Sequence, residues 1–167
     1  NYLANLLQQT LTSDTAQLYE VLLALTASAN MGMQIFHIQG PVGSGKSTCI
    51  RAFCVLYSLL FCGNILILST QNAPCNKFCA DMFETSEHSN IHFTRIAARD
   101  QVAKLRKDNV AFKDCLQGSG VKNQRYLLSK RQTNVIISTI GMTPVSHNHK
   151  GTMQLAIPCE SFDVVFQ

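Results

Sequence analysis

Residues 38–48 constrain the fold of this chain more than any other stretch. Their sequence, IQGPVGSGKST, is a full match to G-x-x-x-x-G-K-[ST], the pattern of a phosphate-binding loop. The fixed positions of the pattern are occupied by Gly40, Gly45, Lys46 and Ser47. Residues 33–38 resemble a short strand, and residues 47–62 contain neither Gly nor Pro and resemble a helix. These flanks argue against a chance match in a surface loop.

The chemistry of such a loop explains its residue types. Glycines allow a tight turn in which successive backbone N–H groups point inward, at the N-terminus of a helix whose partial positive charge favours phosphate. Lys46, predicted to be catalytic, adds a full charge toward the β and γ phosphates, and the Ser47 hydroxyl is placed to ligate Mg²⁺. ATP and Mg²⁺ are therefore the predicted cofactors. The residues expected to contact the nucleotide are Gly40, Pro41, Val42, Gly43, Ser44, Gly45, Lys46, Ser47 and Thr48.

The composition fits one globular domain. The chain has 167 residues, of which 46% are hydrophobic and 14% charged, enough to bury a core. It opens on Asn1 and stops at Gln167, in or at the end of a strand-like run, so we expect a piece of a longer protein. The seven cysteines are an odd number with no secretory signal before them. Reduced thiols and a cytoplasmic or nuclear location are the expectation.

An uncharged stretch at residues 52–75 raises the question of a membrane span. The apolar run at residues 53–62 is too short to cross a bilayer, and Gly63-Asn64 interrupts it before the next apolar run. A buried helix, a turn and a buried parallel strand at residues 65–69 explain the same letters. That arrangement suits a phosphate-loop protein, so the prediction is an α/β fold without a membrane partner.

A polar stretch at residues 69–74 follows this strand and leads into a helix through Cys75, Phe78, Cys79 and Met82. Loops at the carboxyl ends of parallel strands bind ligands in α/β sheets, so this stretch is a candidate contact surface. It also suits a helix start with Pro74 in the first turn, and the two interpretations are compatible. Further elements are predicted as a helix at 12–29 and strands at 91–96, 135–139 and 164–166.

Cysteines and histidines in the same region raise a zinc alternative. Cys75 and Cys79 precede His88 and His92, and these residue types are zinc ligands. The gap of eight residues between the two pairs is shorter than in the usual zinc finger. Core packing of a helical cysteine face explains the pattern better, so no metal site of this kind is predicted.

Residues 100–132 are basic, with eight Lys or Arg against three Asp. Val102, Leu105, Phe112 and Leu116 have roughly helical spacing, a Gly-Ser-Gly turn follows at 118–120, and a helical pattern resumes at 121–132. We predict a basic helical hairpin inserted between strands. It suits contact with a nucleic-acid backbone, whereas a solvated helix pair is the alternative.

Several of these signals, in this order, resemble the first motor domain of a superfamily 1 RNA/DNA helicase of the up-frameshift (nonsense-mediated decay) type. IQGPVGSGKST is similar to that family's phosphate loop, and ILILSTQNAP to its next motif, a strand that leads into Ser-Asn-Ala-like residues. NVIISTIGMT resembles the later strand that ends in Thr. FDVVFQ resembles the strand before the family's Asp-Glu-x-x-Gln motif, so the acidic residues are expected after Gln167. The basic hairpin also falls where these helicases have a helical insertion.

The resemblance implies a three-layer, RecA-like P-loop NTPase fold with a mostly parallel sheet and a basic helical insertion. Residues 1–32 would be a helical lead-in, and residues 33–167 an incomplete motor domain. Asn72 and Thr139 would lie along single-stranded RNA or DNA, and a second motor domain of the same protein would be a partner. The family's adenine-contacting Gln falls nearest Thr15, with Gln17 two places away.

Three functions remain open at this point. The first is an ATP-dependent helicase in which ATP hydrolysis drives movement along single-stranded nucleic acid. The second is a binding module for nucleotide and nucleic acid that has no turnover. The third is another P-loop class, either a transporter ATPase or a small-molecule kinase, since GPVGSGKST suits both. The choice between RNA and DNA, the direction of travel and the pathway are left open by the sequence.

Overall fold

The structure is a computed structural model that describes residues 39, 41, 43–61, 63–86, 91–118, 134–140, 145–147, 153–155 and 164–166. The chain divides into two compact units, Asn1–Phe61 and Cys62–Gln167. The helix expected at residues 12–29 and the strand expected at 33–38 lie outside the described residues.

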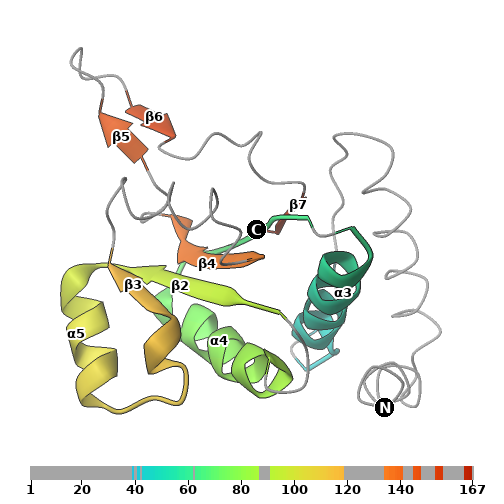
Figure 1. Ribbon diagram of the computed structural model, residues 1–167, viewed down its shortest axis with the longest axis horizontal. Coiled ribbons are helices and arrows are strands. Elements are labelled where there is room, and N and C mark those ends of the chain that lie inside the picture. Colours follow the sequence, from blue (N-terminus) through green and yellow to red (C-terminus); the bar gives the residue numbers. More distant parts are fainter. Residues whose placement is uncertain are drawn as a thin grey trace. The chain divides into compact units, whose positions relative to one another are not determined.

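The second unit is built on a five-stranded sheet with the order β3-β2-β4-β1-β7 (Figure 1). Every strand pair in this sheet is parallel. The strands are β1 (Ile65–Ser69), β2 (Phe93–Ala97), β3 (Leu116–Gly118), β4 (Val135–Thr139) and β7 (Val164–Phe166). The predicted α/β class and parallel sheet are confirmed, and the strands predicted at 65–69, 135–139 and 164–166 have the observed bounds.

The register of the sheet aligns the carboxyl ends of the neighbouring strands β1 and β4. β1 pairs with β4 in step, from Ile65 beside Val135 to Ser69 beside Thr139. Side chains alternate between the two faces of a strand, so Leu66 and Ile136 lie on one face, where they form a buried cluster with Ile96. Ser69 and Thr139, the hydroxyl residues that end β1 and β4, are therefore neighbours at the carboxyl end of the sheet.

Helix α4 (Asn72–Ser86) begins directly after β1 and packs against β1, β2 and β4. Figure 1 shows it running along one face of the sheet. Its buried residues recur at helical spacing: Cys75, Phe78, Cys79, Met82 and Thr85. This spacing is the reason that the segment forms an amphipathic helix rather than a strand, and it confirms the predicted helix.

The first helix predicted in the basic region is shorter than expected. Helix α5 (Arg99–Lys107) packs against β3 and ends well before Leu116, which lies in β3 beside Arg95. Asn109 has a left-handed φ of 50°, its N–H donates to the Arg106 carbonyl, and the Val110 N–H donates to the Leu105 carbonyl. This hydrogen-bond pair is the Schellman arrangement that ends helices, so the helical spacing of Phe112 and Leu116 is coincidental.

The chain then forms a 3₁₀ turn, η1 (Lys113–Cys115), before β3. The second predicted helix of the basic hairpin, at 121–132, lies outside the described residues. An antiparallel pair, β5 (Val145–His147) with β6 (Met153–Leu155), lies between β4 and β7 in the chain, where no strand was predicted. Within the described parts of the chain, no helix is long and apolar enough to span a membrane.

Candidate nucleotide and nucleic-acid sites

The phosphate-binding pattern adopts a glycine-dependent loop at the start of helix α3 (Lys46–Phe61). Gly43 and Gly45 have φ values of +85° and +81°, in the left-handed region that L-residues with a Cβ rarely adopt. The Ser44 N–H donates to the Pro41 carbonyl at 3.3 Å, which closes a turn, and the Cys49 N–H donates to the Gly45 carbonyl at 2.9 Å as the helix starts. The loop conformation thus explains why glycine occupies these two positions.

Lys46 lies over this loop rather than away from it. Its Nζ donates to the Pro41 carbonyl at 2.7 Å and to Ser44 Oγ at 3.2 Å. Both acceptors are neutral, so a phosphate oxygen placed at the loop would be a stronger acceptor for the same ammonium group. The predicted role of Lys46 requires such an exchange.

The electrostatics of the α3 N-terminus favour an anion. The helix has 16 residues and no acidic residue in its first turn, so its partial positive charge is not offset there. Gly43, Ser44 and Ser47 are exposed, and Thr48 is half-buried. The hydroxyl of Ser47 is therefore accessible for the predicted Mg²⁺ contact, whereas Gly40 and Val42 lie outside the described residues.

Several side chains along α3 are buried. Phe53 stacks on Tyr57, one turn later, with ring centroids 5.3 Å apart. Burial raises the pKa of the Cys49 and Cys54 thiols, so both stay protonated at neutral pH. These thiols are core groups rather than nucleophiles.

A second polar cluster lies at the carboxyl end of β1 and β4. Asn72, the first residue of α4, is three residues beyond Ser69, and Ser69 is the register partner of Thr139. The structure therefore brings together the two residues predicted to contact nucleic acid. Asn72 is half-buried and accessible, whereas Thr139 exposes only 8% of its surface.

The centre of this cluster is Arg95, a fully buried side chain on β2. It donates from NH2 to Asn72 Oδ1 at 2.7 Å and from Nε to Asn76 Oδ1 at 3.4 Å. NH1 donates to the carbonyls of Ile96 and Ile137. Sequence reasoning missed this residue, although its charge at a position that shares a strand face with Ile91 and Phe93 was a signal for it.

Thiols beside the guanidinium are neutral. Burial raises the pKa of Cys75 and Cys79, and the nearby Arg95 charge opposes that rise only in part. The Cys75 thiol donates to the Ser138 carbonyl at 3.3 Å. Among the described residues, all four hydrogen-bond acceptors of Arg95 are neutral oxygens, and its positive charge has no anionic partner.

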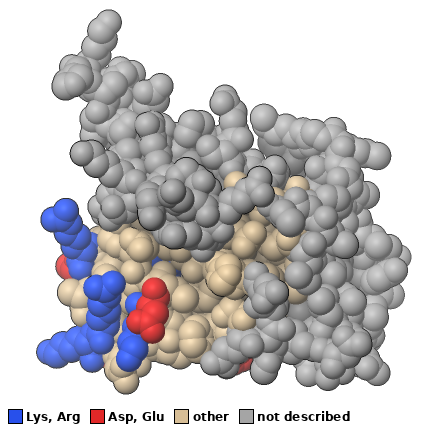
Figure 2. Space-filling model, in the orientation of Figure 1, with Lys and Arg blue, Asp and Glu red and all other residues tan. Residues whose placement is uncertain are grey.

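Basic side chains cover the surface over α5. Figure 2 shows Lys and Arg gathered on the side of the molecule that α5 occupies in Figure 1, with a smaller acidic area among them. The exposed basic residues here are Arg99, Lys104, Arg106, Lys107 and Lys113, and the exposed acidic residues are Asp100, Asp108 and Asp114. The charged residues in the described part of the predicted basic insertion therefore face solvent, as both of its interpretations require.

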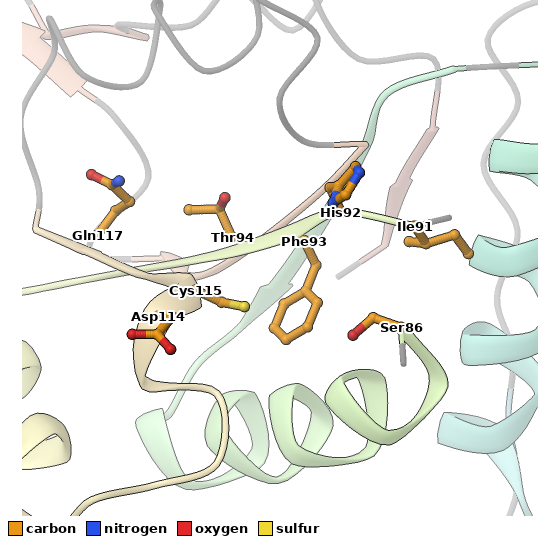
Figure 3. Close-up of a pocket in the computed structure, with 8 residues that line it drawn as sticks. All are labelled: Ser86, Ile91, His92, Phe93, Thr94, Asp114, Cys115 and Gln117. Carbon is orange, nitrogen blue, oxygen red and sulfur yellow. The ribbon is translucent and has the colours of Figure 1, made fainter. Parts of the chain in front are cut away.

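A hollow of about 240 Å³ lies at the amino end of β2, away from Asn72 and Thr139. Its lining residues are Ser86, Ile91, His92, Phe93, Thr94, Asp114, Cys115 and Gln117. Figure 3 shows the Phe93 ring and the Cys115 thiol on the α4 side of the strands, with Thr94 and Gln117 on the other side. Burial, and secondarily Asp114, raises the pKa of Cys115, which leaves its thiol a poor nucleophile.

Metal-binding side chains do not gather in the part of the chain that the structure describes, where no group of three His, Cys, Asp or Glu could hold an ion. Cys75 and Cys79 are buried on α4, while His88 of the zinc alternative lies outside the described residues.

Comparisons of the chain with protein-family models, with curated proteins and with solved structures found no match.

Proposed function

We propose that this chain is the ATP-binding part of the first motor domain of an ATP-dependent RNA or DNA helicase, with a P-loop NTPase fold of the RecA type. The main support is the phosphate loop, in which Gly43 and Gly45 hold left-handed conformations and Lys46 lies over the turn. Backbone N–H groups, a helix N-terminus and a lysine ammonium are the groups that bind a triphosphate.

ATP and Mg²⁺ fit the residues present. Gly43 to Thr48 would hold the phosphates, and Ser47 would contribute its exposed hydroxyl to Mg²⁺. A metal-bound nucleotide supplies the phosphoryl group that water attacks, and this chain's own contribution is to bind and orient it. In the family that the chain resembles, an acidic residue positions the attacking water.

Nucleic-acid binding is proposed for the carboxyl end of the sheet. Asn72 lies three residues beyond Ser69, the register partner of Thr139, and α4 has no acidic residue in its first turn to repel a phosphate. The exposed basic residues over α5 would add attraction for the nucleic-acid backbone. Movement along a strand would need a second motor domain, which supplies an arginine finger in the family that the chain resembles.

Nucleotide affinity tests the first part of this proposal. Loss of the Lys46 ammonium in Lys46→Ala removes a charge-assisted bond of about 1.5–3 kcal/mol, which corresponds to about ten- to hundredfold weaker binding. Titration of a fluorescent ATP analogue with Mg²⁺ measures this affinity, and Lys77→Ala, an exposed lysine on α4, is the matched control. Equal affinity of Lys46→Ala and the unsubstituted chain would contradict the proposal.

Binding of a labelled single-stranded oligonucleotide separates the remaining alternatives. A helicase domain binds the oligonucleotide with an affinity that falls as salt rises, whereas a transporter ATPase or small-molecule kinase does not bind it. With the second motor domain present, a helicase also hydrolyses ATP faster when the oligonucleotide is added. Binding of both ligands without stimulated hydrolysis would support the non-catalytic binding module instead.

A further inference from the structure

We propose that Arg95 is a positioning residue for nucleic-acid binding, which holds the Asn72 and Asn76 amides with their oxygens inward and their N–H₂ donors available to a bound strand. The inference rests on the proposed function, because it concerns the same nucleic-acid surface. It adds Arg95 and Asn76, which neither the motif pattern nor the resemblance identified.

The orientation of both amides follows from the chemistry of arginine. A guanidinium group has only donors, so the amide atoms that face it at 2.7 Å from NH2 and 3.4 Å from Nε must be oxygens. An amide whose oxygen is held in this way leaves its nitrogen for another acceptor. Among the described residues, neither the Asn72 nor the Asn76 amide nitrogen has an acceptor, and both side chains are partly exposed.

The two amides belong to one surface. Asn72 and Asn76 are four residues apart on α4, so they lie on the same face of the helix, one turn apart. Both amides belong to the first two turns of α4, and the partial positive charge at this helix N-terminus also favours an anion. Phosphate and sugar oxygens of a single strand are acceptors of the kind that such a row of donors binds.

Arg95 cannot make this contact itself. Its side chain is fully buried, and NH1 is held by the carbonyls of Ile96 and Ile137, so a strand on the surface does not reach it. Its effect on binding must pass through the groups that it orients. A buried cation with neutral partners is costly to maintain, and a role in placing the Asn72 amide accounts for its presence.

Arg95→Met tests the inference, because methionine is an apolar side chain that a core site accommodates. We expect binding of a fluorescein-labelled single-stranded oligonucleotide to weaken about tenfold, since the Asn72 amide loses the bond that orients it. Arg95→Met removes no cation that contacts the strand, so the dependence of affinity on salt stays the same. Lys77→Met, an exposed cation on the same helix, is the matched control for lost charge, and we expect less than a twofold effect.

A double-mutant cycle distinguishes positioning from a general structural role. If Arg95 acts through Asn72, Arg95→Met weakens binding in the unsubstituted chain but has little further effect in Asn72→Ala. Equal losses in both backgrounds would overturn the inference. It would also be overturned if folded Arg95→Met bound as tightly as the unsubstituted chain.

Asn72→Asp keeps the test decisive if Arg95→Met does not fold. The carboxylate retains an oxygen for Arg95 and suits a helix N-terminus, so we expect the thermal midpoint to stay equal or rise. The outward N–H₂ is replaced by an oxygen that repels phosphate, so oligonucleotide binding should fall more than tenfold. Retained binding in Asn72→Asp would overturn the positioning inference, whereas no binding by the unsubstituted chain would overturn the proposed nucleic-acid function as well.

Discussion

Substitution of Gly43 tests whether the observed loop conformation is the one that binds nucleotide. Its φ of +85° is in the left-handed region, and an added Cβ would meet no atom of the described residues within 4 Å. The cost of Gly43→Ala is therefore conformational rather than steric, about 1–2 kcal/mol for an L-residue. If the loop must hold this φ to bind phosphate, ATP affinity falls by about five- to thirtyfold.

A series at this position separates backbone conformation from side-chain size. Asparagine is larger than alanine but tolerates left-handed φ better, so we expect Gly43→Asn to bind ATP more tightly than Gly43→Ala. Gly118→Ala is the matched control, because that glycine has no positive φ and its added Cβ would make only an ordinary 3.8 Å contact with Arg99. We expect no change in ATP affinity there.

Titration of a fluorescent ATP analogue at fixed Mg²⁺ gives the dissociation constants, and circular dichroism confirms that each variant is folded. Two results would refute the reasoning. Unchanged affinity of Gly43→Ala would mean that the loop changes its φ when nucleotide binds. Equal losses in Gly43→Asn and Gly43→Ala would mean that any side chain at this position obstructs the phosphate.

Two further predictions concern stability. Burial raises the pKa of Cys54 and Cys79 above 9.0, so the native state keeps both thiol protons while the unfolded chain loses them in alkaline solution. The two thiols therefore leave the free energy of unfolding unchanged below about pH 8. Above about pH 9 they lower it, by at most about 1.4 kcal/mol per pH unit for each thiol. Urea unfolding at a series of pH values measures this slope, which Cys79→Ala should reduce. At the end of α5, Asn109→Gly removes the residual cost of a φ of 50° and should stabilise the chain by about 0.5 kcal/mol. Asn109→Ala should destabilise it, and the same sign for both substitutions in urea unfolding would contradict the role of that φ.

The central elements were predictable because local and tertiary signals agree there. The uncharged run after the phosphate loop separates into a helix and β1 at Gly63-Asn64, where the turn residues predict a break. Apolar spacing in α4 matches the face that packs on the sheet. In both segments the buried residues have the period of the element that they form, so pattern and packing lead to the same answer.

The end of α5 was predicted wrongly because apolar spacing alone cannot show where a helix stops. Val102 and Leu105 are buried on α5, but the next apolar residues at helical spacing belong to the turn before β3 and to β3 itself. Asn109 was the usable signal, since asparagine tolerates the left-handed φ that ends a helix. The short β5 and β6 strands were missed because each has only three residues, too few to establish an alternating pattern.

Arg95 could not be assigned a role from the sequence because its partners depend on sheet register. Its amide contacts on α4 lie 23 and 19 residues earlier, and its contact with the Ile137 carbonyl crosses to β4. A strand shifted by one residue would turn this side chain to the opposite face. The phosphate loop is different, since its function is contained in consecutive residues and could be predicted without knowledge of the sheet.

The two candidate sites use a cation in opposite ways, and this difference makes them separable by experiment. Lys46 is partly exposed, and a phosphate oxygen can replace its contacts with the Pro41 carbonyl and Ser44 Oγ, so its charge contributes directly to affinity. Arg95 is fully buried, and its charge can act only through the Asn72 and Asn76 amides that it orients. Loss of Lys46 should therefore make ATP binding less sensitive to salt, whereas loss of Arg95 should weaken oligonucleotide binding at every salt concentration by the same factor. A salt-dependent effect of Arg95→Met would place its charge in contact with the strand, in conflict with the complete burial of its side chain.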